Sequence, residues 1–468
     1  MTRALLVLAL VAAACGGDDV LSPEALQDPA KCMECHPKHY DQWSGSMHAY
    51  ASVDPVFVAM NKRGQRETNN QLGTFCVQCH APMAVALQLT DGTDYDPANL
   101  PAAANGITCY YCHDVASVVA DHNNGNKIAL DSTMHGGLHN PVTSPAHESV
   151  YDPIMDSDTN DSAMCGGCHD VVTPRGVALE RTFAEYKPTF FSDNDPKHHL
   201  TCGSCHMPAS DDVVADAPSL NVPLRPFGFH EHLWPAIDQA TTAFPNQDVM
   251  ASGIQKILGP SVGIIGPAEP GTNTPTGGIC VDAQNGGEIT VRMDALSVAH
   301  AWPTGTSQDR RAWLEVIAYD ASNAIVFSSG VVPDGTDPDD IAATDPSMFT
   351  LWDRTFKDDG TPAHFFWDVA TEDTTHHLKQ PVTLDQNSPL FDHSSTQAFV
   401  VGAKRAQIDH ITARVRIRPF ELGLLSDLVA SGDLDPAVIA NVHTLDVKGT
   451  VRTWTAATTD AAGCTDDF

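Results

Sequence analysis

Residues 279–468 contain several short runs in which apolar and polar positions alternate. The clearest runs cover residues 288–293, 313–319, 324–327 and 413–418. Alternation with a period of two predicts strands that bury one face, and the turn at 320–323 predicts a hairpin between the second and third runs. A helix is expected near 421–430. Short strands separated by turn signals predict an all-β sandwich domain over 279–468.

The preceding part of the chain has a different pattern. Residues 31–235 contain few long periodic runs, so we expect mostly short α-helices and loops there. Residues 236–278 include Gly259-Pro260, Gly266-Pro267 and Pro270-Gly271, a density of breakers that predicts a linker. The overall expectation is a two-domain protein with an N-terminal region of helices and loops and a C-terminal β-sandwich.

An apolar run at residues 4–14 follows Arg3 and ends at Cys15. The run is too short to span a bilayer and is typical of the apolar part of a signal peptide. Ala12-Ala13-Ala14-Cys15 resembles a bacterial lipoprotein signal, which predicts a signal peptide at 1–14, a lipid on Cys15 and a tether at 15–30. The protein is then exported, as an outer-membrane lipoprotein on the periplasmic side or the cell surface. Ordinary secretion is the alternative.

The chain is strongly acidic. Its 468 residues carry 26 Lys and Arg against 59 Asp and Glu, a formal net charge of −33, although only 18% of residues are charged. Such a field repels phosphate backbones, which argues against nucleic-acid binding. It favours a partner protein with a basic docking surface.

Thirteen cysteines are present, and ten of them form five copies of Cys-x-x-Cys-His. This pattern is the c-type haem attachment signature: two thiols one helical turn apart bond the porphyrin, and the histidine becomes the proximal iron ligand. Zinc knuckles and disulfides, the alternatives, do not require that histidine. We therefore predict five covalently attached haems c. The motifs are Cys32, Cys35 and His36; Cys76, Cys79 and His80; Cys109, Cys112 and His113; Cys165, Cys168 and His169; and Cys202, Cys205 and His206.

The five motifs lie within residues 31–235, the predicted pentahaem domain. So little chain for each macrocycle predicts that the haems themselves form the core. Cys280 and Cys464 remain near the two ends of the β-domain, where they form either a disulfide or two unpaired thiols.

A sixth iron ligand is expected from the other histidines of the haem region, which outnumber the haems. In a helix over 38–48, His48 lies too far from His36 to bind the same iron but can reach a neighbouring one. His39 lies one turn from His36 on the same side of that haem. His135 is preferred to His139, and His230 to His232. The predicted distal ligands are His48, His135, His147, His198 and His230.

The segment from Cys32 to Ala49, Cys-x-x-Cys-His-Pro-x-x-Tyr-x-x-Trp-x-x-Ser-x-His-Ala, resembles multihaem cytochromes related to the tetrahaem electron acceptor of hydroxylamine oxidoreductase. The resemblance implies that His48 ligates a neighbouring haem. His300-Ala-Trp-Pro-Thr-Gly305 and the following run to Val316 are similar to the domain that follows the haems in many exported multihaem cytochromes. His300 either caps a haem or stabilises the bend at 303–305.

These features predict an electron carrier in which mainly bis-histidine haems form a closely packed chain. Bis-histidine ligation and surrounding carboxylates lower the haem potentials. One alternative is a multihaem oxidoreductase with one five-coordinate haem that acts on a small nitrogen or sulfur compound. Another gives the β-domain the main role, in binding a partner or in assembling a homo-oligomer or filament.

Overall fold

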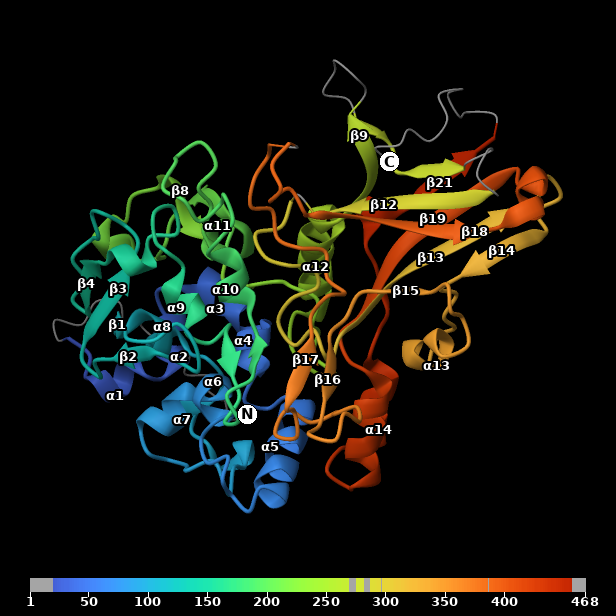
Figure 1. Ribbon diagram of the computed structural model, residues 1–468. Coiled ribbons are helices and arrows are strands. Elements are labelled where there is room, and N and C mark those ends of the chain that lie inside the picture. The colour runs from blue at the N-terminus through green and yellow to red at the C-terminus, as the bar shows by residue number, and fades with distance from the viewer. Residues whose placement is uncertain (1–19, 269–274, 282–286, 296, 386, 457–468) are drawn as a thin grey trace, which may run out of the picture.

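The computed structural model describes residues 20–268, 275–281, 287–295, 297–385 and 387–456. Two regions lie side by side: short helices and loops from the N-terminal half, and antiparallel sheets from the C-terminal half (Figure 1). This arrangement confirms the predicted fold class. The predicted signal peptide, Cys15 and Cys464 lie outside the described residues.

The helices of the first region are short because caps and prolines recur along the chain. Ser46 is an example: its side chain accepts a hydrogen bond from the amide of Ala49 at 3.2 Å and starts a new helix just after Gly45. The helix expected over 38–48 is therefore divided into α3 and α4. The helices are α1 (Pro23–Leu26), α2 (Pro29–Met33), α3 (Pro37–Ser44), α4 (Met47–Tyr50), α5 (Pro55–Glu67), α6 (Val77–His80), α7 (Pro82–Ala86), α8 (Cys109–His113), α9 (Ala163–Gly166), α10 (Thr182–Tyr186) and α11 (Cys202–His206).

Strands of the first region occur as two-stranded pairs among the described residues. The pairing of β3 with β4 is parallel, and the other three pairs are antiparallel. The pairs are β1 (Val115–Val118) with β2 (Asn126–Ile128), β3 (Thr133–Gly136) with β4 (Glu148–Tyr151), β5 (Val171–Val172) with β6 (Ala178–Glu180), and β7 (Ala209–Asp212) with β8 (Arg225–His230).

The C-terminal region is a sandwich of two main sheets. Within the described ranges, one sheet has five strands and the other has six. Their apolar faces share one core, to which β12, β13 and β19 contribute every second side chain. The first sheet contains β9 (Gly263–Ala268), β10 (Pro275–Gly277), β11 (Ile279–Val281), β12 (Glu288–Asp294) and β18 (Ser394–Val400). The second contains β13 (Arg311–Tyr319), β14 (Ile325–Ser329), β15 (Phe349–Thr350), β19 (His410–Arg418), β20 (Leu445–Asp446) and β21 (Arg452–Thr455).

All four predicted strands are present, as β12, β13, β14 and β19, and β13 pairs with β14 as the predicted hairpin. The predicted helix is α14 (Leu422–Ala430). Two further elements lie beside the sandwich in this half, α13 (Pro338–Ala342) and the pair β16 (Arg354–Phe356) with β17 (Thr371–Asp373).

The predicted linker over 236–278 is corrected by the structure. Residues Gln247–Ser261 form helix α12, and β9 follows directly. Met250, Ile254 and Leu258 are buried in the core of the sandwich, so this segment belongs to the second region. Gly259-Pro260 lies in the last turn of α12. A proline in the last turn interrupts few of the backbone hydrogen bonds of the helix.

The two regions are joined by a second apolar cluster. Helix α5 of the first region contributes Val56 and Ala59 to this cluster, and α14 contributes Leu424, Leu425 and Leu428. The two helices lie in the lower part of Figure 1. At the edge of this cluster, Nε1 of Trp367 donates to Glu67 at 3.0 Å, and Arg66 pairs with Asp433 at 2.6 Å. The haem region and the sandwich therefore form one docked unit.

Gly64 of α5 lies at the closest approach of this cluster. A Cβ at that position would come within 2.4 Å of Leu72 and 2.9 Å of the Trp367 ring. We expect Gly64→Ala to destabilise the protein by about 1–3 kcal/mol, because overpacking outweighs the better helix propensity of alanine. Thermal unfolding measures the change. Gly253→Ala, in α12, is the control, since the nearest approach there is 3.0 Å to the end of Leu233; equal destabilisation by both variants would contradict the packing argument.

Candidate haem attachment and ligation sites

Each of the five motifs lies on a single helical turn. The motif at His36 shows the pattern, since the His36 amide donates to the Cys32 carbonyl at 2.8 Å. The corresponding bonds are 3.3 Å at His80 and 2.9 Å at His169, and the third and fifth motifs form α8 and α11. A helical turn puts both thiols and the histidine on one side of the backbone, as attachment to one porphyrin requires.

Four of the proximal histidines are oriented by backbone carbonyls. Nδ1–H of His36 donates to Val214 at 2.7 Å and that of His80 to Ala51 at 3.2 Å. The other two are His113, which donates to the carbonyl of His135 at 2.7 Å, and His206, which donates to that of Pro235 at 2.9 Å. This bond fixes the tautomer and leaves Nε2 with its lone pair, which is the usual outer-shell arrangement of a metal-binding histidine.

Three proximal histidines face a second imidazole at nearly the same separation. The ring centroids of His36 and His147 are 6.3 Å apart, and those of His113 and His232 are 6.2 Å apart. Two imidazoles bound to one metal ion from opposite sides, with bonds of about 2.0 Å, have ring centres about 6 Å apart. These pairs leave the space that one iron needs.

The third pair is His169 with His48, whose ring centroids are 6.3 Å apart. His48 is enclosed by protein, and burial lowers its pKa to about 3. Its Nδ1 is buried without a hydrogen-bond partner in the described part of the chain. A neutral, buried imidazole with an unused nitrogen fits a metal ligand. His48 therefore lies beside the histidine of another motif and not beside His36.

Three of the predicted distal histidines have other partners. Nδ1 of His135 bonds Asp152 at 2.7 Å, and Nε2 of His198 bonds Asp193 at 2.8 Å. His230 contacts the hydroxyl of Ser157 at 3.2 Å and donates from Nδ1 to the Met207 carbonyl at 3.1 Å. No ring pairing in the described part of the chain joins these three histidines to a proximal histidine, and their ligation stays a prediction.

His232, two residues after His230, is the histidine whose ring is paired with that of His113. It follows strand β8, and its Nδ1–H donates to the carbonyl of His230 at 2.8 Å, which turns the ring toward His113. Burial lowers its pKa to about 3. The sequence offered both histidines as candidates but no pattern that favours one. Which ring points toward His113 depends on where β8 ends, and the pairing of β8 with β7 determines that point.

His80 has a different neighbour. The structure describes all 22 histidines, and no ring pairing joins any of them to His80. The ring of Phe57 stacks on it instead, with centroids 4.1 Å apart and an angle of 5° between the planes. The second motif thus has a proximal histidine without a histidine opposite it.

The motifs lie against one another through their thiols. Cys32 is a hydrogen-bond partner of Cys109, Cys79 of Cys168, and Cys165 of Cys202. Cys112 also lies close enough to Cys168 for their charges to interact. Contacts therefore run from the first motif to the third, from the third to the fourth, and from the fourth to both the second and the fifth.

Nine of the ten motif cysteines are free thiols. Cys35 is disulfide-bonded, as is Cys280. A thioether bond at Cys35 needs that sulfur reduced, so haem attachment and the disulfide exclude each other there. Cys280 is therefore not an unpaired thiol, and its pairing with Cys464, which lies outside the described residues, stays a prediction.

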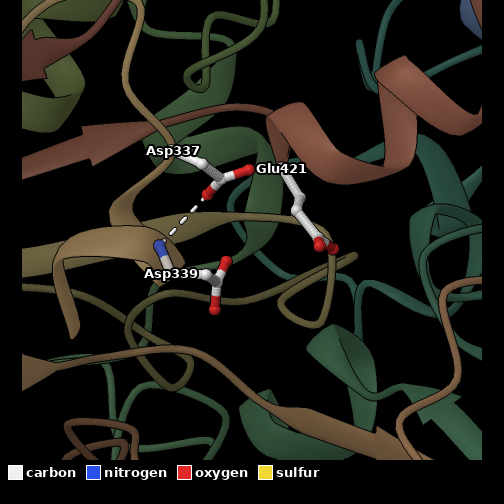
Figure 2. A group of neighbouring side chains, drawn as sticks. All are labelled: Asp337, Asp339 and Glu421. Carbon is white, nitrogen blue, oxygen red and sulfur yellow. Dashed lines mark hydrogen bonds between the residues drawn. The ribbon is translucent and has the colours of Figure 1, made fainter. Parts of the chain in front are cut away.

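One acidic cluster outside the motifs has the composition of a cation site. Asp337, Asp339 and Glu421 bring carboxylate oxygens within 4.8 Å of one another (Figure 2). The cluster already contains a cation, because Arg311 bonds Asp339 and contacts Glu421 at 2.8 Å. Asp337 caps α13 and accepts from the amides of Asp339 and Gly423 at 3.1 and 2.7 Å. These contacts explain the cluster as an ion-pair network.

Within the described residues, no helix is both long and apolar enough to cross a membrane.

Residues 31–114, which hold the first three motifs, match the family model for cytochrome c554 and c-prime. No curated protein matches the chain. The crystal structure of a penta-heme cytochrome c552 from Thermochromatium tepidum is similar in fold, with a TM-score of 0.58 and 18% sequence identity, over 90% of this chain and 97% of that one.

The fold similarity extends over both regions, whereas the family match is confined to the start of the haem region. The five motifs are independent of both comparisons and carry the chemistry of attachment. The five motifs, together with the family match over residues 31–114 and the similar fold, support five covalently attached haems c.

Proposed function

We propose that this protein is an exported electron carrier whose five haems c form a continuous path, most of them with two histidine ligands. The observation that carries the proposal is the facing of His36 with His147, His113 with His232 and His169 with His48 at 6.2–6.3 Å. Haem iron supplies reversible one-electron chemistry, and an iron with both axial positions filled by protein has no open position for a substrate.

The contacts between motifs support a path and not five separate sites. Because thiols of neighbouring motifs touch, their attachment sites lie next to each other. The fourth motif is linked to the second and the fifth by these thiol pairs, and its Cys168 lies close enough to Cys112 of the third motif for their charges to interact. We infer a branched path with the fourth motif at the junction and the first, second and fifth at the ends.

Charge and burial favour low potentials. The buried imidazoles are kept neutral, and a chain with a net charge of −33 stabilises the ferric state relative to the ferrous state. The same charge favours a redox partner with a basic docking surface. Attachment of the exported protein to the outer membrane through a lipid on Cys15 remains part of the proposal.

Low-temperature electron paramagnetic resonance (EPR) of the ferric holoprotein tests the ligation. We expect low-spin signals from the haems whose proximal histidines face a second imidazole, and denaturing intact mass should show five haems on one chain. High-spin signals from most of the haems would contradict the proposal even if the mass were correct.

A second candidate function rests on His80 alone. Since no histidine faces it in the described structure, the haem of the second motif is the one where a small molecule could bind iron. This observation favours an oxidoreductase acting on a small nitrogen or sulfur compound, with the other haems delivering electrons.

Adding carbon monoxide to the reduced holoprotein distinguishes the two candidates. The second predicts an adduct at about one haem of the five, together with oxidation of the reduced protein by nitrite or hydroxylamine. The pure carrier predicts neither. An adduct that forms without electron loss to either compound would leave the carrier as the function and give the second motif an unreactive open haem.

A further inference from the structure

The segment 300–310 of the second region lies against the haem region. Glu185 of α10 accepts a hydrogen bond from the Ala301 amide at 3.2 Å and another from the Thr304 hydroxyl at 2.5 Å. The hydroxyls of Thr182 and Thr304 are 2.9 Å apart. At the other end of the segment, Arg310 pairs with Asp238 at 3.2 Å.

The two anchor points lie beside the fourth and the fifth motif. In α10 the Phe183 amide donates to the His169 carbonyl at 3.1 Å, and Asp238 stands three residues after Pro235, whose carbonyl accepts from Nδ1 of His206. His300 is buried, and its ring lies close enough to His206 and also to His169 for their charges to interact. Of the two proximal histidines near His300, His169 already faces His48, whereas no ring pairing among the described residues joins His206 to another histidine.

The orientation of His300 is fixed by its own backbone. Nδ1–H donates to the Ala301 carbonyl at 2.8 Å, and in the described part of the chain the ring makes no other hydrogen bond. The bend at 303–305 is held by Thr304 and Glu185, so Nε2 of His300 is not needed for it. This bond is the same one that orients four of the proximal histidines.

Arg310 provides a second observation from the same segment. Its side chain is 13% exposed, and its Nε is buried without a hydrogen-bond partner among the described residues. The guanidinium lies near both His169 and His300. A buried N–H donor of this kind needs an acceptor, and a haem carboxylate between the two regions would supply one.

We propose that His300 of the β-sandwich is the sixth ligand of the haem attached at the fifth motif, with Arg310 as the partner of a haem carboxylate. The proposal rests on the proposed function. It makes the sandwich part of the redox centre: the coordination of this haem depends on the docking of the two regions through segment 300–310.

The test uses the intact holoprotein with three variants. His300→Ala should convert one of five haems from low-spin to high-spin in the EPR spectrum and create one carbon monoxide site beyond any in the parent. His300→Met should restore a low-spin haem at a higher potential, because a methionine ligand raises the potential relative to histidine. His410→Ala, on β19 beside Tyr319, is the matched control and should change nothing.

Unchanged spin states and carbon monoxide binding in His300→Ala would overturn the proposal. Five haems by intact mass in every variant keep this outcome separate from failure of the proposed function, which would appear already in the parent protein. If His300→Ala does not accumulate, Arg310→Gln decides: the proposal predicts a shifted potential for one haem with all five attached, and an unshifted set of potentials would contradict it.

Discussion

Replacing His232 by alanine is expected to remove the sixth ligand of one haem and leave the other four unchanged. The His232 ring faces His113 with centroids 6.2 Å apart, and the ring of His39, 4.6 Å from His232, has no ring pairing with His113. The EPR spectrum of the ferric variant should lose the low-spin intensity of one haem and gain a high-spin signal. An iron with an open position should also bind carbon monoxide after reduction.

His230→Ala is the matched control, because the two histidines are two residues apart and both belong to the haem region. His230 contacts Ser157 and the Met207 carbonyl, so its loss should cost a small amount of stability and no iron ligand. Equal spectra for the two variants would contradict the assignment. A high-spin signal in His230→Ala with an unchanged His232→Ala would reverse it.

Stability should fall as the pH rises from 4 to 8. Burial raises the pKa of Asp54, Glu180 and Asp309 to about 7 each. The folded protein therefore holds protons on these groups that the unfolded chain has released, so their contribution is fully present below pH 4 and is lost as the pH passes 7. Allowing for partial solvent access, we expect a loss of at least about 1–2 kcal/mol, measured by chemical denaturation of the holoprotein.

Asp309→Asn isolates one of these groups. Besides burial, the nearby carboxylate of Glu421 raises the pKa of Asp309. The asparagine carries no charge to desolvate, so the variant should lose less stability between pH 5 and pH 8 than the parent. Asp248→Asn, at an exposed position of α12, should leave the pH dependence unchanged. A parent protein that becomes more stable on going from pH 5 to pH 8 would contradict the sign.

The elements that depend on local sequence pattern, the strands and the attachment motifs, were predicted correctly. Alternation of apolar residues identified strands such as β12 and β19, because each strand buries one face in the common core. The haem attachment motifs are also local, since both thiols and the histidine share one helical turn. The segment 236–278 was predicted as a linker because of its Gly-Pro pairs. Gly259-Pro260 instead lies at the end of helix α12, whose apolar residues are buried only because the helix packs against the sandwich.

The second axial ligands depend on long-range contacts, and here the sequence was less informative. His147 lies 111 positions after His36 in the chain, and His48 meets the histidine of the fourth motif. His230 and His232 are only two residues apart, and the pairing of β8 with β7 determines which of the two rings faces His113. His300 was left open because its position depends on how segment 300–310 docks on α10.

A reductive titration of the holoprotein through small mediators, with the electrons counted against protein mass, tests the account most directly. We predict that each chain takes up five electrons, in overlapping steps at low potential, and returns them on reoxidation. An uptake of fewer than five electrons by a protein that carries five haems by intact mass would contradict a continuous path through all five sites.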